Sequence, residues 1–369
     1  MTADDGQRAS APEALVAPGS APTAPRGPAS LTPRRFQPAA DVLSGETADV
    51  YFERARTILA AERLDPVVAM EIFAREDGIL CGAEEVLAYL REILGEARGL
   101  DPEPVVESLR DGDPIARKEV VMRITARYSA FGLYETAILG ILAQSTGWAT
   151  AARRIVDAAA PIPVIGFGAR HVHPSVADQM DYASVVGGCI GASTPAGARL
   201  AGLSPTGTMP HALIIIFGDT VRAVEAFDRH IDPDVPRIAL VDTFKDEAEE
   251  ALRVADALGE RLWGVRLDTP SERGRVTPDL VKEVRARLDL AGHDHVRIVV
   301  SGGLDPDRIT YFKETGAPVD SFAVGSAISD ASPIDFTGDI KEIDGRPIAK
   351  RGRIPGRTAN PRLAHVDLG

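Results

Sequence analysis

The sequence is poor in cysteine and has no long apolar run. Its 369 residues contain two cysteines, Cys81 and Cys189. Two thiols cannot build a disulfide framework or a cysteine-rich metal site, so we expect both to be reduced and buried. No apolar run reaches the roughly 18 residues that a membrane-spanning helix needs, and residues 1–40 lack the apolar core of a signal peptide. These absences predict a soluble cytoplasmic protein.

Positive charge is also scarce. Lys and Arg together number 41 against 54 Asp and Glu, which gives a formal net charge of −13. Such a chain has no general attraction for nucleic acid or for an anionic membrane, so neither is expected as a partner. The balance still leaves room for a local basic pocket that binds a phosphorylated small molecule.

The composition changes along the chain and predicts a tail followed by two domains. Residues 1–40 are rich in Ala, Pro and Ser, so they cannot bury enough apolar surface to offset the entropy of ordering, and we predict a disordered tail. Residues 41–160 are expected to form an N-terminal α+β sandwich, and residues 161–334 an α/β barrel. A hairpin signal at Asp344-Gly345 predicts that residues 335–355 return to the first domain as strands.

The first domain contains patterns of both helix and strand. Residues 84–97 have apolar side chains at helical spacing, and a further helix is expected to begin within residues 48–55. Residues 119–127 alternate in hydrophobicity, which predicts a half-buried strand. Residues 133–159 predict either one helix or two helices that are separated by a break near Gly147.

Five apolar segments in the second domain end in polar residues where a strand would stop. They cover residues 164–170, 238–243, 264–269, 297–303 and 322–326. Helical patterns separate the last four, at about residues 245–258, 277–290 and 305–315. Alternating strands and helices form the repeat of an α/β barrel, whose active site lies at the C-terminal ends of the strands. The series predicts an enzyme with an irregular, TIM-like barrel.

Two late strands end in glycine and serine. Ser301, Gly302 and Gly303 follow one strand, and Gly325 and Ser326 follow the next. Glycine lets a ligand approach the backbone closely, and backbone N–H groups with hydroxyls bind phosphate. Barrels commonly bind phosphate after their last strands, so we predict a phosphate site here. Two tight turns without a ligand are the alternative.

Charged side chains are expected at the same mouth. Asp242, Arg266 and Asp268 lie at or near strand ends, and Arg266 and Asp268 leave their strand on the same side because they are two residues apart. Such carboxylates suit ribose hydroxyls or a Mg²⁺-bound pyrophosphate. The alternative interpretation is a structural ion pair.

A ring-binding pair and a histidine complete the candidates. Phe167 and Arg170 suit a flat anionic ring, because the ring can stack on the Phe167 side chain while its carboxylate pairs with the Arg170 guanidinium. His211 begins an apolar run after Gly-Thr-Met-Pro, and it is a candidate nucleophile toward phosphate, a candidate general acid–base group, or a polar cap. His171 and His173 do not predict a metal site, because His211 is the only further histidine expected nearby.

The order and spacing of these motifs resemble the nicotinate phosphoribosyltransferases of archaea and some bacteria. The resemblance runs from about Ala48 to Gly352. It is carried by residues 48–54, 131–140, 167–170, 207–213, 266–270, 300–305 and 324–325. It implies the type II phosphoribosyltransferase fold, in which an open-faced N-terminal sandwich lies on an irregular α/β barrel. It also implies an obligate dimer whose active sites are completed by the neighbour's N-terminal domain.

The resemblance assigns substrates and roles. It implies that nicotinate and phosphoribosyl pyrophosphate form nicotinate mononucleotide in NAD salvage, with Mg²⁺ on the pyrophosphate and with ATP as a candidate second substrate. Tyr51 of the neighbour would stack the pyridine ring against Phe167, with Arg170 beside it. His211 falls on the histidine that is phosphorylated in members that use ATP. The ribose or its pyrophosphate would be held by Asp242, Arg266 and Asp268, and the 5′-phosphate by Ser301, Gly302, Gly303, Gly325 and Ser326.

Two places in the sequence bear on the choice of substrate. Ser193 and Thr194 occupy the place where nicotinamide-using relatives carry a carboxylate. Hydroxyls donate to a carboxylate substrate, which favours nicotinate. Many relatives carry two arginines where this chain has Arg170 and His171, and quinolinate, with two carboxylates, would need a denser cationic pocket.

Three alternatives remain at this stage. The first is a quinolinate phosphoribosyltransferase. The second is a non-catalytic barrel that senses a nucleotide or phosphoribosyl ligand, which would not need the whole set of polar residues at the mouth. The third is an aldolase-like or epimerase barrel, which needs a Schiff-base lysine or a metal cluster that the strand ends lack.

Overall fold

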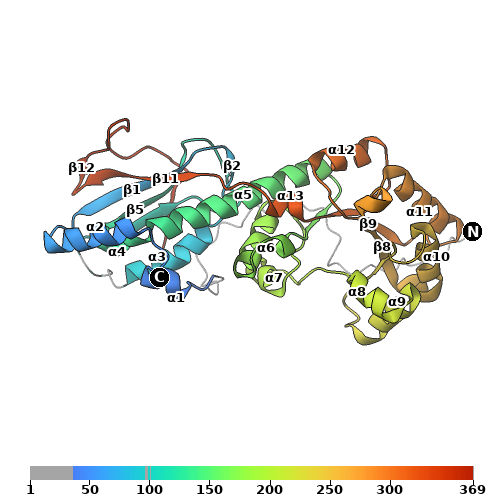
Figure 1. The fold of residues 1–369 in the computed structure, drawn as a ribbon. Coiled ribbons are helices and arrows are strands. Elements are labelled where there is room, and N and C mark those ends of the chain that lie inside the picture. The colour runs from blue at the N-terminus through green and yellow to red at the C-terminus, as the bar shows by residue number, and fades with distance from the viewer. Residues whose placement is uncertain (1–35, 96–98, 100, 369) are drawn as a thin grey trace, which may run out of the picture.

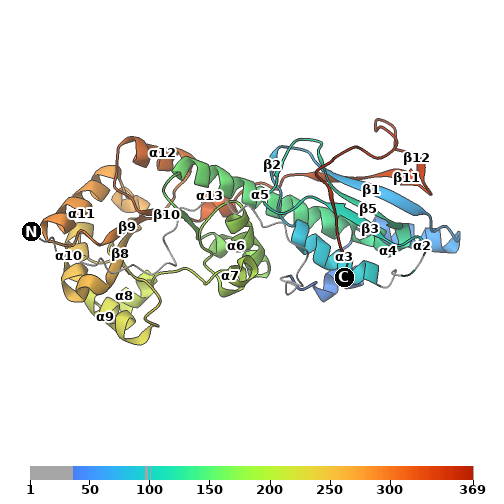
Figure 2. The same cartoon turned by 180° about the vertical axis from the view of Figure 1, so that it is seen from behind.

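The computed structural model describes residues 36–95, 99 and 101–368. The chain forms two lobes side by side, and the long helix α5 (Glu135–Ala159) runs from one into the other (Figure 1; seen from behind in Figure 2). Residues 1–35 of the predicted disordered tail lie outside the described residues. The last part of that tail does not fit the prediction: Phe36 is 6% exposed and packs edge-on against Tyr182, with ring centroids 5.1 Å apart.

The N-terminal lobe is a six-stranded antiparallel sheet with helices on one face (Figures 1 and 2). The strands, in spatial order, are β12 (Arg346–Pro347), β11 (Phe336–Ile343), β1 (Val67–Ala74), β5 (Val120–Arg127), β3 (Val105–Ser108) and β13 (Ala364–His365). A separate pair joins β2 (Gly78–Ile79) to β4 (Pro114–Ile115). The helices are α1 (Ala40–Ser44), α2 (Val50–Ala61), α3 (Ala83–Gly95), α4 (Tyr128–Phe131) and the first half of α5.

The predicted C-terminal hairpin is confirmed. β11 and β12 pair across Asp344 and Gly345, whose φ angles of 47° and 72° are those of a tight hairpin turn. β11 also pairs with β1 along Val68–Ala74, so this late segment completes the first sheet.

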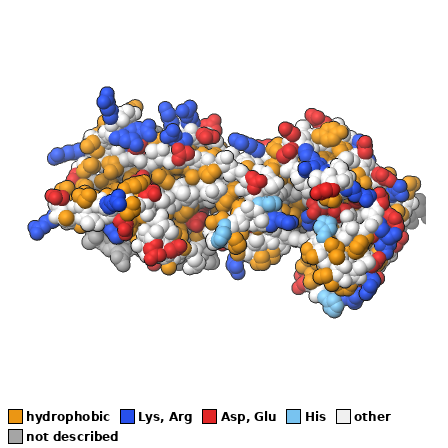
Figure 3. All heavy atoms as spheres, in the orientation of Figure 1, with side chains coloured by type: hydrophobic (Ala, Val, Ile, Leu, Met, Phe, Trp, Pro, Cys, Tyr) orange, Lys and Arg blue, Asp and Glu red, His pale blue; other side chains and the backbone are white. Residues whose placement is uncertain are grey.

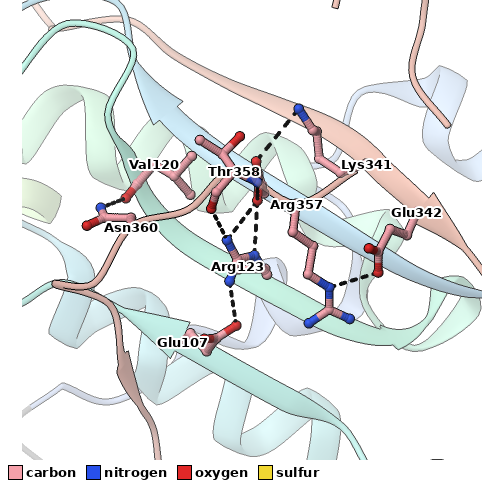
Figure 4. Close-up of polar contacts among 9 residues, drawn as sticks. Glu107, Val120, Arg123, Lys341, Glu342, Arg357, Thr358 and Asn360 are labelled. Carbon is pink, nitrogen blue, oxygen red and sulfur yellow. Dashed lines mark hydrogen bonds and ion pairs between the residues drawn. The ribbon is translucent and has the colours of Figure 1, made fainter. Parts of the chain in front are cut away.

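One local prediction is wrong and another, left open between one helix and two, is decided by contacts with distant segments. The strand expected to be half-buried, β5, is buried on both faces. Val121 and Arg123 lie on the outer face and are buried because residues after β12 cross that face of the sheet (Figure 4). Of the two alternatives for residues 133–159, one helix or two broken near Gly147, the structure has one continuous helix, α5. A Cβ at Gly147 would lie 2.5 Å from the Ser332 carbonyl oxygen, so glycine permits a close approach there.

The C-terminal segment is fixed to that sheet by a buried guanidinium (Figure 4). Arg123 donates to Glu71 at 2.8 and 3.0 Å, to Glu107 at 2.8 Å and to the Thr358 carbonyl at 2.6 Å. The backbone N–H of Thr358 donates to the same Glu71 carboxylate at 2.8 Å. A buried charge is tolerated only when it is paired in this way, and the pairing ties residues 235 positions apart in the chain.

In the space-filling view, Lys and Arg side chains lie along the upper edge of this lobe (Figure 3).

The second lobe holds a five-stranded parallel sheet, and the predicted strands and following helices are confirmed. The strands, in spatial order, are β6 (Val164–Gly166), β10 (Ser321–Val324), β9 (Arg297–Val300), β8 (Leu262–Leu267) and β7 (Arg237–Leu240). The helices that follow β7, β8 and β9 are α10 (Glu247–Leu258), α11 (Pro278–Leu290) and α12 (Pro306–Glu314).

The barrel is irregular between β6 and β7, as predicted. In the part of the chain that is described these two strands do not pair, and four helices lie between them in sequence. They are α6 (Ala177–Val186), α7 (Pro195–Ala201), α8 (His211–Phe217) and α9 (Thr220–His230). The fold class, an irregular α/β barrel with an N-terminal sandwich, is confirmed. No helix within the described ranges is long and apolar enough to cross a membrane.

Candidate active site

Polar side chains from adjacent strands meet at one mouth of the barrel. Arg266 lies near the end of β8, Asp268 directly follows it, and Ser301 directly follows β9. Arg266 donates from Nε to Ser301 Oγ at 2.9 Å and from Nη2 to Asp268 Oδ2 at 2.8 Å. Ser301 Oγ in turn donates to Asp268 Oδ1 at 2.8 Å. Arg266 and Asp268 therefore do point to the same side, where they form an ion pair that also holds the serine of the glycine loop.

His211, the first residue of α8, lies between two carboxylates. Its Nε2 is 3.6 Å from Asp242 Oδ2 and 3.6 Å from Asp268 Oδ2, and its Nδ1 is 3.1 Å from Thr243 Oγ1. The His211 side chain is 39% exposed, so the imidazole contacts the buried Asp242 carboxylate and the half-buried Asp268 carboxylate and still faces solvent. This is the position that a proton- or phosphoryl-accepting group needs.

The three ionisable side chains have different electrostatic environments. The Asp268 carboxylate raises the pKa of His211, against the opposing effect of burial and with a further contribution from Asp242. Burial alone would raise the pKa of Asp268, but His211, Arg266 and the Ser301 hydroxyl outweigh it and hold that pKa below its usual range. Burial raises the pKa of Asp242 to about 6, which the His211 charge partly offsets.

Asp242 has the features of a magnesium ligand. Its side chain is 2% exposed, and its Oδ1 has no hydrogen-bond partner among the described residues. A desolvated carboxylate oxygen with a free lone pair is the ligand that Mg²⁺ prefers. No group of three or more His, Cys, Asp and Glu side chains in the described ranges is positioned to hold a metal by itself. The residues therefore fit an ion that takes most of its ligands from a bound substrate.

The glycine loops require glycine. Gly302 and Gly303 have φ angles of 91° and 60°, a backbone region that other residues rarely adopt. A Cβ on Gly325 would lie 3.1 Å from the Phe167 carbonyl oxygen and 3.0 Å from His171 Cε1. The loop after β10 therefore packs against the segment after β6. Ser326 begins the short helix α13 (Ser326–Ser329).

The two ring-binding candidates lie at the end of β6. Phe167 directly follows the strand, and the Arg266 Cζ lies 5.3 Å from the centroid of its ring. Phe167 is thereby joined to the charged network through a cation–π contact. Arg170 lies in a short 3₁₀ helix (Ala169–His171), and its side chain is exposed.

Three predicted substrate residues lie outside this network, Tyr51 as expected of a residue that would serve the neighbour's site. Tyr51 is 57% exposed on α2, in the other lobe from the barrel mouth, and its hydroxyl donates to Asp49 at 3.3 Å (Figure 1). Ser193 and Thr194 donate their hydroxyls to the buried Asp181 carboxylate, at 3.4 and 2.8 Å. Thr194 also accepts from Gly197 N at 3.0 Å and so caps α7. Within one chain, the mouth is therefore built without Tyr51.

Some residues of the network were missed from the sequence. Thr208 Oγ1 accepts from Arg266 Nη1 at 3.2 Å, and Thr243 contacts His211. Both were within reach, since Thr208 lies in the segment around His211 and Thr243 directly follows Asp242. Asp181 gave no signal, because it lies within a helix and its role depends on a loop that comes later in the chain.

A cavity of about 320 Å³ lies elsewhere, between α2 and the segment that ends at Leu133, and it is lined by Phe52, Leu59 and Tyr128 among others. We place the active site at the barrel mouth and not in this cavity, because among the described residues it is the mouth that combines perturbed carboxylates, a histidine and glycine loops. Figure 3 shows acidic, basic and histidine side chains gathered on the barrel lobe.

A parallel barrel that presents two glycine loops beside paired carboxylates, an arginine and a histidine is the architecture of an enzyme acting on a phosphorylated substrate. The chain belongs to the quinolinate phosphoribosyl transferase family: the models of its N-terminal and C-terminal domains match residues 49–146 and 148–339. The division between the two models falls within α5.

The known proteins that this chain resembles carry two different enzyme names. A nicotinate phosphoribosyltransferase of Mycobacterium tuberculosis is 31% identical over 317 residues, which cover 81% of this chain and 66% of that protein. A probable nicotinate-nucleotide pyrophosphorylase (carboxylating) of Methanothermobacter thermautotrophicus is 24% identical, over 80% of this chain and 95% of that protein. A crystal structure of a nicotinate-nucleotide pyrophosphorylase from Pyrococcus furiosus is 44% identical, with a TM-score of 0.78, and covers 87% of this chain and 81% of that one.

Proposed function

We propose that the protein transfers the phosphoribosyl group of phosphoribosyl pyrophosphate to nicotinate, forming nicotinate mononucleotide and pyrophosphate. The observation that carries this proposal is the continuous network from Asp242 through His211 and Asp268 to Arg266 and Ser301. It runs from a buried carboxylate to the first residue of a glycine loop. This order matches a ligand that has a phosphate at one end, beside the glycine loop, and a charged leaving group at the other end, beside Asp242.

Each part of the substrate has a matching part of the mouth. The 5′-phosphate binds the backbone of Gly302, Gly303 and Gly325 together with Ser301 and Ser326, because these turns admit an anion close to backbone N–H groups. The ribose and pyrophosphate lie along Asp242, Arg266 and Asp268. The pyridine ring stacks on Phe167, and Arg170 pairs with its carboxylate.

The chemistry needs positioning more than acid–base catalysis. The ring nitrogen of nicotinate is already a nucleophile, so it attacks C1 of the ribose as pyrophosphate leaves through an oxocarbenium-like transition state. Ionised Asp268 and Asp242 place negative charge beside the sugar, and Arg266 holds Asp268 in orientation through its 2.8 Å contact. Magnesium, when bound beside Asp242, supplies positive charge that neutralises the leaving group.

The acceptor acid is the finer part of the proposal. Nicotinate has one carboxylate, and the segment after β6 offers one exposed arginine, Arg170, followed by His171. Quinolinate, with two carboxylates, would call for a second fixed cation here. A quinolinate phosphoribosyltransferase is the second candidate. Nicotinate-nucleotide pyrophosphorylase (carboxylating) is another name for that activity, so the 44% identity to the nicotinate-nucleotide pyrophosphorylase of Pyrococcus furiosus favours it.

Completion of the site by a second subunit is part of the proposal. Val50, Tyr51 and Ile58 on α2 are 54%, 57% and 61% exposed, an apolar surface that a dimer would bury. We propose that Tyr51 of one subunit stacks on the pyridine ring in the other subunit. We also propose that His211 accepts a phosphoryl group when ATP is used, since its imidazole is both accessible and close to the bound phosphates.

A steady-state assay tests the proposal. Purified protein with Mg²⁺ and phosphoribosyl pyrophosphate is given nicotinate, quinolinate or nicotinamide in separate reactions, each with and without ATP. We expect nicotinate mononucleotide from nicotinate. Turnover of quinolinate with release of carbon dioxide, and none of nicotinate, would replace the first candidate by the second.

A further inference from the structure

The segment after β8 places an arginine against the second glycine of the Gly302–Gly303 loop. Arg275 has a φ of 66°, an uncommon value for a residue other than glycine. Its backbone N–H donates to the Pro270 carbonyl at 3.1 Å, which holds the turn in this form. The guanidinium then lies so close to Gly303 that a Cβ on that glycine would be 2.1 Å from Nη1. A strained backbone that sets a charged side chain over a glycine loop calls for a functional explanation.

Arg275 forms no salt bridge with a carboxylate among the described residues. Among carboxylates its charge acts on the exposed Glu272 of the same loop, whose pKa is lowered by hydrogen bonds from its own backbone and from Ser271 and, last, by Arg275. Two other arginines of this region are paired with carboxylates: Arg266 with Asp268 at 2.8 Å, and Arg273 with Glu247 at 3.6 Å and Asp246 at 3.7 Å. Arg275 instead faces a second cation. An arginine beside a glycine loop whose guanidinium is not bonded to a carboxylate leaves room for an anionic ligand.

That second cation is Arg308, at the start of α12. It donates from Nη1 to the carbonyls of Gly302 and Gly303, at 3.1 and 2.8 Å, and from Nη2 to the Val276 carbonyl at 3.0 Å. Burial and then the charge of Arg275 lower the pKa of Arg308, and the charge of Asp305 only partly offsets them. Carbonyl groups satisfy its N–H groups without neutralising its charge. Two adjacent guanidinium groups repel each other until an anion lies between or beside them.

We propose that Arg275 binds the phosphate ester that the Gly302–Gly303 loop holds, with Arg308 positioning that loop through its carbonyls. The inference rests on the proposed function, in which this group is the 5′-phosphate of the ribose. We assign the pyrophosphate to the other side of the loop. Gly302 faces Asp268, since a Cβ added to Gly302 would lie 3.1 Å from Asp268 Oδ1, whereas Gly303 faces Arg275. The two sides of one loop thus meet different parts of the substrate.

The effect of losing Arg275 follows from this position. A charge-assisted hydrogen bond to phosphate is stronger than a neutral one, so its removal weakens binding by roughly tenfold or more. The phosphate ester does not change charge during transfer of the ribosyl group, so the interaction is equally strong in ground and transition states. We therefore expect KM for phosphoribosyl pyrophosphate to rise about tenfold while kcat changes little.

Calorimetric titration with ribose 5-phosphate and with inorganic pyrophosphate tests the inference. The variants are Arg275→Ala and Arg275→Gly, the second of which removes the side chain and suits the positive φ. Arg273→Ala, an exposed arginine in the same loop, is the matched control. We expect both Arg275 variants to bind ribose 5-phosphate at least about tenfold more weakly, with pyrophosphate binding and the control unchanged.

The outcomes separate this inference from the proposed function. If the folded Arg275→Gly protein binds ribose 5-phosphate as the wild type does, the inference is wrong. A loss of pyrophosphate binding alone would also overturn it, because Arg275 would then face the leaving group. Wild-type binding of ribose 5-phosphate without transfer to either acid would reject the proposed function, while the variants still decide the role of Arg275. Binding of neither ligand by the wild type would contradict both.

Discussion

Replacing Asp242 by asparagine should stabilise the ligand-free protein while abolishing its activity. The Asp242 side chain is 2% exposed and its Oδ1 lacks a partner among the described residues. Burial raises its pKa from a usual value of 3.8 to about 6. The ionised carboxylate is therefore less stable in the folded state than in the unfolded one, and Asp242→Asn removes that cost.

The size of the effect follows from the pKa. A rise of about two units corresponds to about 3 kcal/mol, at about 1.36 kcal/mol per unit. Water at the open mouth screens part of this, so we expect Asp242→Asn to stabilise the protein by about 2 kcal/mol at pH 8. Because the folded pKa is raised, the cost is absent below about pH 4, grows between about pH 4 and 6, and is complete above that range. The advantage of the variant should follow the same course.

Thermal unfolding between pH 4 and pH 8 measures this, with Asp268→Asn as the control. Asp268 has a lowered pKa, so its ionised form stabilises the fold above the unfolded pKa and loses that effect as the pH falls through the folded pKa. The two variants should change Tm in opposite directions at pH 8, with Asp242→Asn higher by about 2–4 °C. A Tm of Asp242→Asn that is equal to or below that of the wild type at pH 8, or a gain that persists at pH 4, would refute the reasoning.

Three further results are expected. His211→Gln should lose acid-labile labelling by γ-labelled ATP and any stimulation by ATP, yet retain measurable ATP-independent transfer, because the ring nitrogen attacks without a protein nucleophile; label that survives in the variant would contradict this. Co-expression of Tyr51→Ala with Arg170→Ala chains should restore part of the activity that each variant lacks alone, since one site of the mixed dimer is intact. Ser193→Asp should lower the free energy of unfolding by roughly 2 kcal/mol, because it places a second carboxylate beside the buried Asp181; an unchanged denaturation midpoint would mean that the new side chain turns away from Asp181.

The sequence predicted those features that depend on local spacing. The strand ends were visible as apolar runs that stop at polar residues, and the common direction of Arg266 and Asp268 followed from their separation by two. Their place at the same mouth as Ser301 was also predicted, whereas their direct contact with Ser301 was not, since it depends on β8 and β9 being neighbours in the sheet. Glycines at 302 and 303 were predicted to bind phosphate, and both have the positive φ angles that glycine favours.

Contacts between distant segments were not predictable in this way. Arg123 is buried because residues 235 positions later cross the sheet, and no pattern within β5 records that crossing. The hydroxyls of Ser193 and Thr194 were expected to face a substrate carboxylate, but they donate to Asp181, a helix residue that comes earlier in the chain. Arg275 shows no motif at all, because its importance arises from an unusual backbone angle and from its contact with Gly303.

A competition between the two candidate acids tests the central claim most directly. Both would yield nicotinate mononucleotide, so equal concentrations of ring-deuterated nicotinate and unlabelled quinolinate are supplied together with phosphoribosyl pyrophosphate and Mg²⁺, and the product is analysed by mass spectrometry. The fraction of deuterated product gives the ratio of the two kcat/KM values. We predict product that is almost entirely deuterated. Product that is mainly unlabelled, accompanied by carbon dioxide, would contradict the proposal and assign the protein to quinolinate.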